Sequence, residues 1–235
     1  MKLQLKITLF IDKVFPFSGP LKRFVFACYH SYTPIRKSYS QYHEDNLILH
    51  ELRDWNYKDS IYVDVGANHP TRISNSYLLY RKGWSGITVE PNGGLIKLHR
   101  LFRSRDVQVN VGCGAEASFL RFYVSRTPVL SSFAKNEVEH ILRVKYLPVL
   151  TVDQLLAPFQ DKKIAMLSID TEGFDLNVIK GATETLKRTY LVCVEANDND
   201  EHNKITSLLA EDFEHFVTVG CNLLFRNRHE DLICK

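Results

Sequence analysis

Short, almost continuously apolar segments recur along this chain and alternate with longer segments that have helical spacing. The apolar segments are residues 61–65, 86–89, 107–111, 164–169 and 191–194. The helical segments are residues 44–53, 74–82, 93–103, 151–157, 174–187 and 201–213. Strands that are apolar throughout are covered on both faces, as in a parallel sheet between two layers of helices. The alternation therefore predicts an α/β protein built on a mostly parallel sheet.

Three segments depart from this alternation. Residues 118–125 alternate apolar and polar side chains, which predicts an added strand. Residues 126–148 contain two prolines and a Ser-Ser pair, and we expect an irregular excursion there. Residues 216–219 and 223–226 predict an antiparallel hairpin at the C-terminal end of the sheet.

Composition excludes several classes of protein. Among 235 residues, 45% are hydrophobic and 24% are charged, which is ordinary for a globular protein and unlike a disordered chain or a multi-span membrane protein. Lys and Arg number 30 against 27 Asp and Glu. A net charge of +3 is too small to predict a nucleic-acid partner.

The cysteines suggest a reducing compartment. Their number is odd, and none is in C-x-x-C spacing, so neither a disulfide framework nor a zinc site is predicted. The five are Cys28, Cys113, Cys193, Cys221 and Cys234. We expect reduced thiols and a cytoplasmic location.

The N-terminal segment is basic, aromatic and amphipathic. Residues 1–30 have no apolar run long enough to span a membrane and no signal-peptide cleavage pattern. We divide the chain into this extension, residues 1–37, and a main domain, residues 38–235. The extension is expected to be a helical lid on the main domain or on a second copy in a homo-oligomer. The alternative is a peripheral contact of residues 1–30 with the inner membrane face.

A tight turn follows the first predicted strand. Asp64 precedes Gly66, and this turn would lie at the carboxyl end of the sheet, where ligands bind in such folds. One glycine followed by Asn68 and His69 is a poor match to the G-x-G-x-x-G loop that holds a pyrophosphate. Asp64 could instead receive an ammonium group.

The next two strands also end in polar residues. Glu90 ends the strand 86–89, and a carboxylate there can accept both hydroxyls of a ribose. Asn110 and Gly112 lie at the end of the third strand and could border an adenine. Together these turns predict a nucleoside-containing ligand.

A second acidic group follows the fourth predicted strand. Asp170 and Glu172 would share the crevice with Asp64, either as a general base or as oxygen ligands of a divalent cation. Asp175 falls in the first turn of a helix, where an acid has a structural role. His69 is a further candidate base or hydrogen-bond donor. The sequence leaves these options open.

Several blocks, taken in order, resemble the FkbM-type S-adenosylmethionine-dependent methyltransferases over about residues 38–197. They are YSQYHED (39–45), DVGANHP (64–70), SNSY (74–77), GWSG (83–86), EP (90–91), LTVD (150–153), SIDTEGFD (168–175) and IKG (179–181). The resemblance implies a Rossmann-like class I methyltransferase sheet. It also implies methyl transfer to oxygen, often to a hydroxyl of a sugar or polyketide, with polysaccharides and glycolipids as the expected acceptors.

The resemblance also implies roles for individual residues. The loop on the methionine side of S-adenosylmethionine would comprise Asp64, Gly66, Ala67 and Asn68. The ribose acid would be Glu90, followed by Pro91. Gln41 and Glu44 match the upstream block, which would cap the cofactor, and Asp170 and Glu172 match the acidic block. Pro70 replaces a glycine found in many members, and Asn110 stands where many class I enzymes have Asp.

Two other functions compete with this one. A nicotinamide-dependent sugar oxidoreductase or epimerase would use a related sheet, but the second and third loop glycines and a Tyr-x-x-x-Lys pair near the fourth strand are missing. A non-catalytic protein could keep the fold and dock to a membrane or partner through residues 1–30. The acidic crevice argues against that second alternative.

Overall fold

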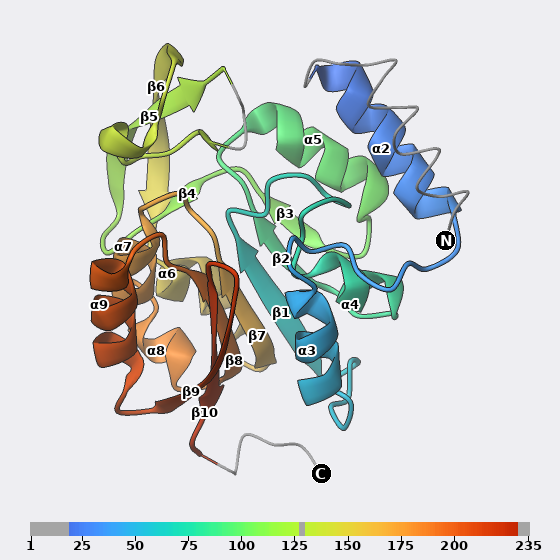
Figure 1. Cartoon of the computed structure of the whole chain (residues 1–235), viewed down its shortest axis with the longest axis vertical. Helices are drawn as coiled ribbons and strands as arrows, with labels where there is room; N and C mark the ends of the chain where they lie inside the picture. Colours follow the sequence, from blue (N-terminus) through green and yellow to red (C-terminus); the bar gives the residue numbers. More distant parts are fainter. Residues whose placement is uncertain (1–18, 127–129, 230–235) are drawn as a thin grey trace.

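A seven-stranded sheet forms the centre of the protein in a computed structural model that describes residues 19–126 and 130–229 (Figure 1). Its strands are β1 (Ser60–Val65), β2 (Gly86–Val89), β3 (Val107–Val109), β7 (Lys163–Ile169), β8 (Thr189–Glu195), β9 (Phe213–Val219) and β10 (Asn222–Asn227). They lie in the order β3-β2-β1-β7-β8-β10-β9. The first five are mutually parallel, and β10 runs antiparallel to both of its neighbours. The predicted parallel sheet and C-terminal hairpin are confirmed.

Strand register brings the predicted functional turns to one edge of the sheet. Val65, the last residue of β1, pairs with Val89 of β2 on one side and with Ile169 of β7 on the other. The turns that begin at Gly66, Glu90 and Asp170 therefore emerge next to one another.

Helices cover both faces of the sheet. They are α3 (Glu44–Glu51), α4 (Tyr77–Arg81), α5 (Gly93–Phe102), α6 (Val152–Leu156), α7 (Asp175–Lys180), α8 (Thr183–Leu186) and α9 (Asn199–Leu209), with 3-10 turns η2 (Lys135–Glu137) and η3 (Ala157–Phe159). Alternate strand residues face opposite ways. Val63 and Val65 pack in a core with α6 to α9, whereas Tyr62 packs in a second core with α3 and α4.

The single helix predicted for residues 174–187 is wrong, because the segment forms α7 and α8 with a break between them. The break lies at Gly181, where an added Cβ atom would come within 2.0 Å of the Gly114 carbonyl oxygen. The chain turns at the point where two backbone segments touch.

A second, three-stranded sheet joins β3 to β7. It consists of β4 (Gly112–Cys113), β6 (Ile141–Leu150) and β5 (Ser118–Ser125), in that order. The strand predicted for residues 118–125 is confirmed. The irregular excursion predicted for 126–148 is wrong from residue 141 onward, because β6 pairs antiparallel with β5. Pro148, which pairs with Phe119, makes this strand look like a loop in the sequence.

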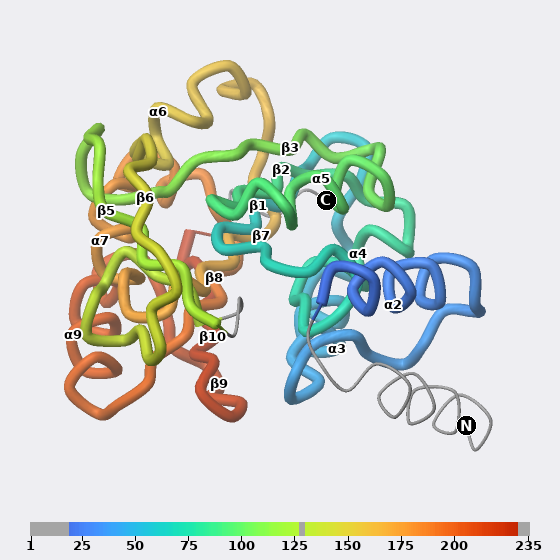
Figure 2. The backbone as a smooth tube through the Cα atoms, turned by 90° about the horizontal axis from the view of Figure 1, so that it is seen from above, coloured from blue at the N-terminus to red at the C-terminus, as the bar shows by residue number. Residues whose placement is uncertain are grey.

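The described part of the N-terminal extension contains α2 (Pro20–Tyr32), which lies beside α5 (Figures 1 and 2). The rings of Phe24 in α2 and Phe102 in α5 pack edge to face with centroids 5.6 Å apart. The buried His30 ring bonds the Thr71 carbonyl at 2.8 Å. Residues 1–18 of the predicted amphipathic segment lie outside the described residues. Across the described ranges, no helix has both the length and the apolar character that crossing a bilayer requires.

Candidate active site

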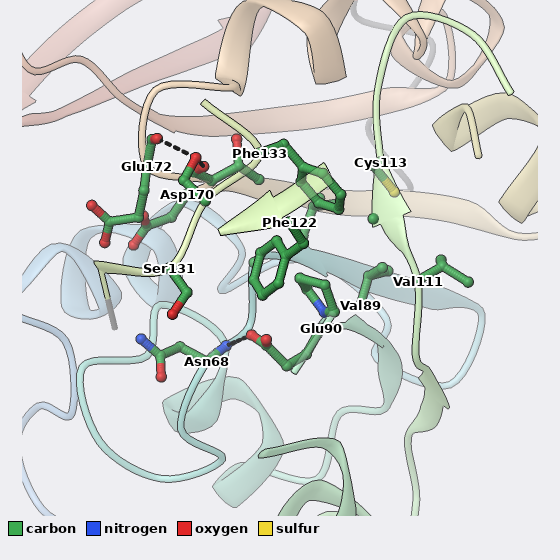
Figure 3. Close-up of a pocket in the computed structure, with 16 residues that line it drawn as sticks. Asn68, Val89, Glu90, Val111, Cys113, Phe122, Ser131, Phe133, Asp170 and Glu172 are labelled. Atoms are coloured by element: carbon green, nitrogen blue, oxygen red, sulfur yellow. Dashed lines mark hydrogen bonds between the residues drawn. The ribbon is translucent and has the colours of Figure 1, made fainter. Parts of the chain in front are cut away.

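A cavity opens at the carboxyl ends of β1, β2 and β7 (Figure 3). The space within it is about 540 Å³, including space open to solvent. Six of the residues predicted to bind cofactor or substrate line it, namely Gly66, Asn68, Glu90, Pro91, Gly112 and Asp170, and Glu172 joins them. The sheet therefore brings together turns that are far apart in the sequence.

Glu90 lies in the floor of this cavity with only part of its hydrogen-bonding capacity in use. One carboxylate oxygen accepts from the Asn68 amide at 2.9 Å (Figure 3), and the other accepts from the Asn92 amide at 2.7 Å. A carboxylate has about four acceptor sites, so two remain for a ligand. Burial raises the pKa of Glu90 to about 7, with the two amides opposing that shift.

One wall of the cavity is largely apolar. It is formed by Val111, Gly112, Cys113, Phe122 and Phe133. A Cβ atom on Gly112 would lie 2.4 Å from the Phe133 ring, so glycine lets this ring approach the backbone. Neither phenylalanine was predicted from the sequence, and neither were the neighbouring Ser131 and Ser132. They come from β5 and the segment after it, where no motif marks them.

Asn110, predicted to border an adenine, does not line the cavity. Its Nδ2 donates to the Glu90 carbonyl oxygen at 2.7 Å. It therefore supports the Glu90 backbone and has no contact with the cavity space.

A second, more polar cavity of about 370 Å³ lies next to the first and shares Gly66 and Asp170 with it. Its other lining residues include Gln41, Glu44, Asp64 and Ala67, all predicted to contact the cofactor. Glu44 also accepts hydrogen bonds from the Tyr42 amide at 2.7 Å and from Asn222 Nδ2 at 3.2 Å. The upstream block thus closes one end of this cavity.

Asp64 belongs to a buried polar network under the second cavity. It accepts a hydrogen bond from the Ser76 hydroxyl and lies 3.9 Å from the Arg103 guanidinium. Arg103 is fully buried and donates to Asp106, Tyr62 and Ser76 at 2.7–2.9 Å. Burial raises the pKa of Asp64, and Arg103 opposes that rise. No sequence motif indicated Arg103.

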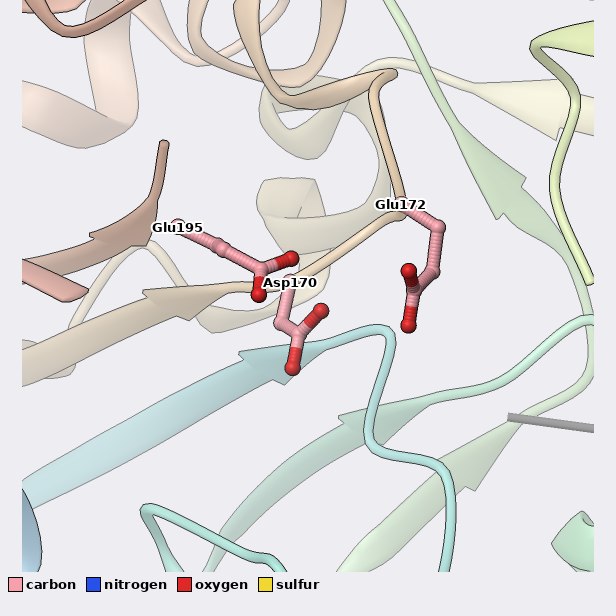
Figure 4. Close-up of side chains that lie close together, drawn as sticks. All are labelled: Asp170, Glu172 and Glu195. Carbon is pink, nitrogen blue, oxygen red and sulfur yellow. The ribbon is translucent and has the colours of Figure 1, made fainter. Parts of the chain in front are cut away.

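Asp170, Glu172 and Glu195 form an acidic cluster at the boundary of the two cavities (Figure 4). One carboxylate oxygen from each lies within 4.8 Å of the others. Burial and the neighbouring Glu195 and Glu172 raise the pKa of Asp170 well above its usual range. Burial and Glu195 raise the pKa of Glu172 to about 8. Such a set of oxygens suits either proton transfer or a hard divalent cation.

The loop that carries this cluster has an unusual backbone. Glu172 and Gly173 both have positive φ, 53° and 82°. Asp175 accepts from the amides of Thr171 at 2.9 Å and Gly173 at 3.1 Å, which closes the turn. The Ser132 hydroxyl donates to the Glu172 carbonyl at 2.7 Å. Asp175 thus has contacts of the structural kind predicted for it.

The geometry does not support His69 as a base. Its Nε2–H donates to the Arg23 carbonyl at 3.0 Å, and its Nδ1 accepts from the Thr71 amide at 3.2 Å. Both ring nitrogens are therefore engaged outside the cavities. Burial lowers the pKa of His69 to about 4, which keeps the ring neutral.

These buried acids predict that the free protein loses stability in mild alkali. Burial raises the pKa of Glu172 to about 8 and that of Asp175 to about 7, whereas both ionise near pH 4 in an unfolded chain. The folded state then binds more protons than the unfolded state up to about pH 8, so the free energy of unfolding falls as pH rises.

Buried His30, His69 and His99 have lowered pKa values and produce the opposite trend below about pH 6.5. We therefore expect Tm, measured by calorimetry, to fall by several degrees between about pH 6.5 and 8.5. The decline should be smaller in Glu172→Gln. If Tm fell equally with pH in the two proteins, the raised pKa of Glu172 would be contradicted.

Comparisons with known proteins agree with this geometry. A family model described as the methyltransferase FkbM domain matches residues 64–222. The comparison with curated proteins gave no match.

Three solved structures are weakly similar. A Klebsiella pneumoniae protein provisionally described as an O-methyltransferase has a TM-score of 0.47 at 10% identity, over 94% of this chain and 96% of that one. The METTL16 methyltransferase domain has a TM-score of 0.47 at 9% identity, over 80% and 67%. A human methyltransferase 10 domain containing protein has a TM-score of 0.38 at 8% identity, over 90% and 82%. Similarities at this level carry no argument about fold or chemistry.

The matched residues include the turns at Gly66, Glu90 and Asp170 that line the cavities. The match begins at Asp64, ends at Asn222 and covers well over half of the chain. Together with the strand order, it confirms the predicted Rossmann-like class I methyltransferase fold. The chain belongs to the FkbM methyltransferase family.

Proposed function

We propose that this protein transfers the methyl group of S-adenosylmethionine to a hydroxyl oxygen of a saccharide, in a polysaccharide or a glycolipid. Membership of a methyltransferase family implies S-adenosylmethionine as the donor. The observation that carries the proposal is the pair of adjacent cavities, with the Glu90 carboxylate in one and an acidic cluster at their boundary.

The residues present fit this donor. Glu90 has free acceptor sites for two ribose hydroxyls, and the wall containing Phe122 and Phe133 suits a flat purine. The carboxylates of Asp64 and Asp170 in the second cavity suit a ligand that carries ammonium and sulfonium charges. When bound, the donor supplies an electrophilic methyl group on a positively charged sulfur.

Glu172 is the base in this proposal. A sugar hydroxyl is a weak nucleophile at neutral pH, so a side chain must accept its proton as the new bond to the methyl carbon forms. Burial and the neighbouring Glu195 raise the pKa of Glu172 to about 8, which is near working pH. In its ionised form, the Glu172 carboxylate accepts the proton of the acceptor hydroxyl.

The acceptor class is supported by chemistry at the cavity and by the sequence resemblance. Asn68 and Ser131, whose side chains lie near one another in Figure 3, are hydrogen-bonding groups of the kind that hold sugar hydroxyls. Incubation with S-adenosylmethionine and a panel of saccharides, followed by mass spectrometry, tests the proposal. We expect one added methyl group on oxygen. Transfer only to nitrogen or carbon acceptors would refute it, and no transfer to any acceptor would favour the non-catalytic docking alternative.

Glu90→Ala is expected to weaken binding of S-adenosylhomocysteine by about 100-fold or more, because two hydrogen bonds to a charged group are lost. Asn110→Ala is the matched control, since Asn110 bonds the Glu90 carbonyl from outside the cavity. We expect less than about a tenfold change there, the scale of one neutral hydrogen bond. Titration calorimetry on variants with wild-type melting profiles measures both. Equal affinities in all three proteins would remove Glu90 from the binding site.

A further inference from the structure

We propose that α2 and α5 together form a docking surface for a lipid leaflet that contains anionic headgroups. Charge in these elements is one-sided. Residues 19–37 and 93–105 contain no Asp or Glu, although the whole chain is nearly balanced. Their Lys and Arg residues are Lys22, Arg23, Arg36, Lys37, Lys97, Arg100, Arg103 and Arg105. Of these, Lys37, Lys97, Arg100 and Arg105 are exposed, and exposed bases attract an anionic surface.

Large apolar side chains are exposed among these bases. Leu21 is 60% exposed, Phe24 43% and Leu101 66%. They lie on two helices that contact each other, since Phe24 of α2 packs on Phe102 of α5, the residue after Leu101. Exposed basic groups together with exposed apolar side chains are the features by which amphipathic helices bind a membrane interface.

This surface lies against the loop that carries the candidate site. The His69 ring donates to the Arg23 carbonyl of α2, and the His99 ring of α5 donates to the Asn68 carbonyl, each at 3.0 Å. Figures 1 and 2 show α2 at the edge of the molecule, with α5 between it and the sheet. A docked surface would hold the cavity near the leaflet, so that a lipid-linked acceptor could reach it. Only that last step rests on the proposed function.

Lipid explains this surface better than nucleic acid does. Phosphate backbones attract Lys and Arg, but they give no reason for Leu21 and Leu101 to be more than half exposed. A leaflet accommodates both kinds of side chain. The exposed apolar side chains therefore favour a lipid leaflet over a nucleic acid as the partner.

Vesicle sedimentation of the full chain tests the proposal. We expect binding to phosphatidylcholine–phosphatidylglycerol vesicles and little binding to phosphatidylcholine alone. The double variant Lys97→Glu, Arg100→Glu should bind the anionic vesicles at least about tenfold more weakly. Lys180→Glu, Lys204→Glu on α7 and α9 makes the same charge change elsewhere on the surface and should bind like wild type. Leu21→Ser, Leu101→Ser should lose the binding that survives in high salt.

Each contrary outcome overturns the proposal. One is that the wild-type protein does not bind anionic vesicles. Another is that the two charge-reversal variants bind vesicles equally well. The third is that the serine variant binds like wild type in high salt. If duplex DNA binds and competes with vesicles while the serine variant behaves like wild type, the partner is a nucleic acid. S-adenosylhomocysteine affinity, expected to be unchanged in all variants, separates failure of docking from failure of the proposed function.

Discussion

Glu172→Gln is expected to lower kcat by about 10²–10⁴-fold while leaving the affinity for S-adenosylhomocysteine nearly unchanged, because general-base catalysis acts on turnover. The substitution keeps the shape of the side chain and removes its ability to accept a proton. With the pKa of Glu172 at about 8, wild-type kcat should rise with pH up to that value, since only the ionised carboxylate works. The profile of the variant should lose this rise. Single-turnover assays over a pH series measure both effects.

Two controls make this result specific. Glu137→Gln neutralises an exposed neighbour whose charge contributes to the raised pKa of Glu172. It should shift the pH profile toward lower pH with little loss of maximal kcat. EDTA should leave wild-type kcat unchanged. If EDTA abolished activity and Mg²⁺ restored it, Asp170, Glu172 and Glu195 would be cation ligands instead. Loss of kcat in Asp170→Asn but not in Glu172→Gln would transfer the role of base to Asp170.

Much of the fold follows from local patterns. The five parallel strands are apolar because helices cover both of their faces, so the sequence locates each within about two residues. Strand β6 has no such signal. Most of its residues are partly or fully exposed, and its apolar side chains do not alternate with polar ones. Only pairing with β5 makes this segment a strand, and pairing depends on residues far away in the chain.

From the sequence, the site residues could be predicted only where they lie in a turn that directly follows a predicted strand. Gly66, Glu90 and Asp170 each follow a strand, and parallel register brings them together, as expected. Glu195 directly follows the predicted strand 191–194, but its approach to Asp170 depends on how far β8 extends beside β7. His69 shows how a position within one loop can suggest a role that distant contacts do not support. Its position in the loop suggested a base, whereas its partner, the Arg23 carbonyl, comes from a helix 46 residues earlier in the chain.

Gly66→Ala should cost more stability than any substitution discussed above. Gly66 has a φ of 81°, and an added Cβ atom would lie 1.7 Å from the backbone carbonyl oxygen of Asp170. That carbonyl cannot rotate away as a side chain would, because the adjacent Asp170 amide donates to the Val65 carbonyl at 3.0 Å. The ends of β1 and β7 would have to separate. We expect the free energy of unfolding to fall by more than about 4 kcal/mol, which exceeds most single substitutions.

Gly83→Ala is a control that measures the cost of backbone strain without a clash between the added Cβ atom and another backbone segment. Gly83 has a φ of 103°, but its Cβ would meet only the Tyr57 ring, at 3.7 Å. Strain alone costs about 1–3 kcal/mol, which is the loss expected for this control in urea unfolding. S-adenosylhomocysteine binding should persist in Gly83→Ala and disappear in Gly66→Ala, even under conditions in which the latter is folded. Separation of β1 from β7 moves Asp170 and Glu172 away from Glu90, so the two halves of the site no longer face one cavity. Similar stability and affinity in the two variants would show that contact between these strand ends does not assemble the site.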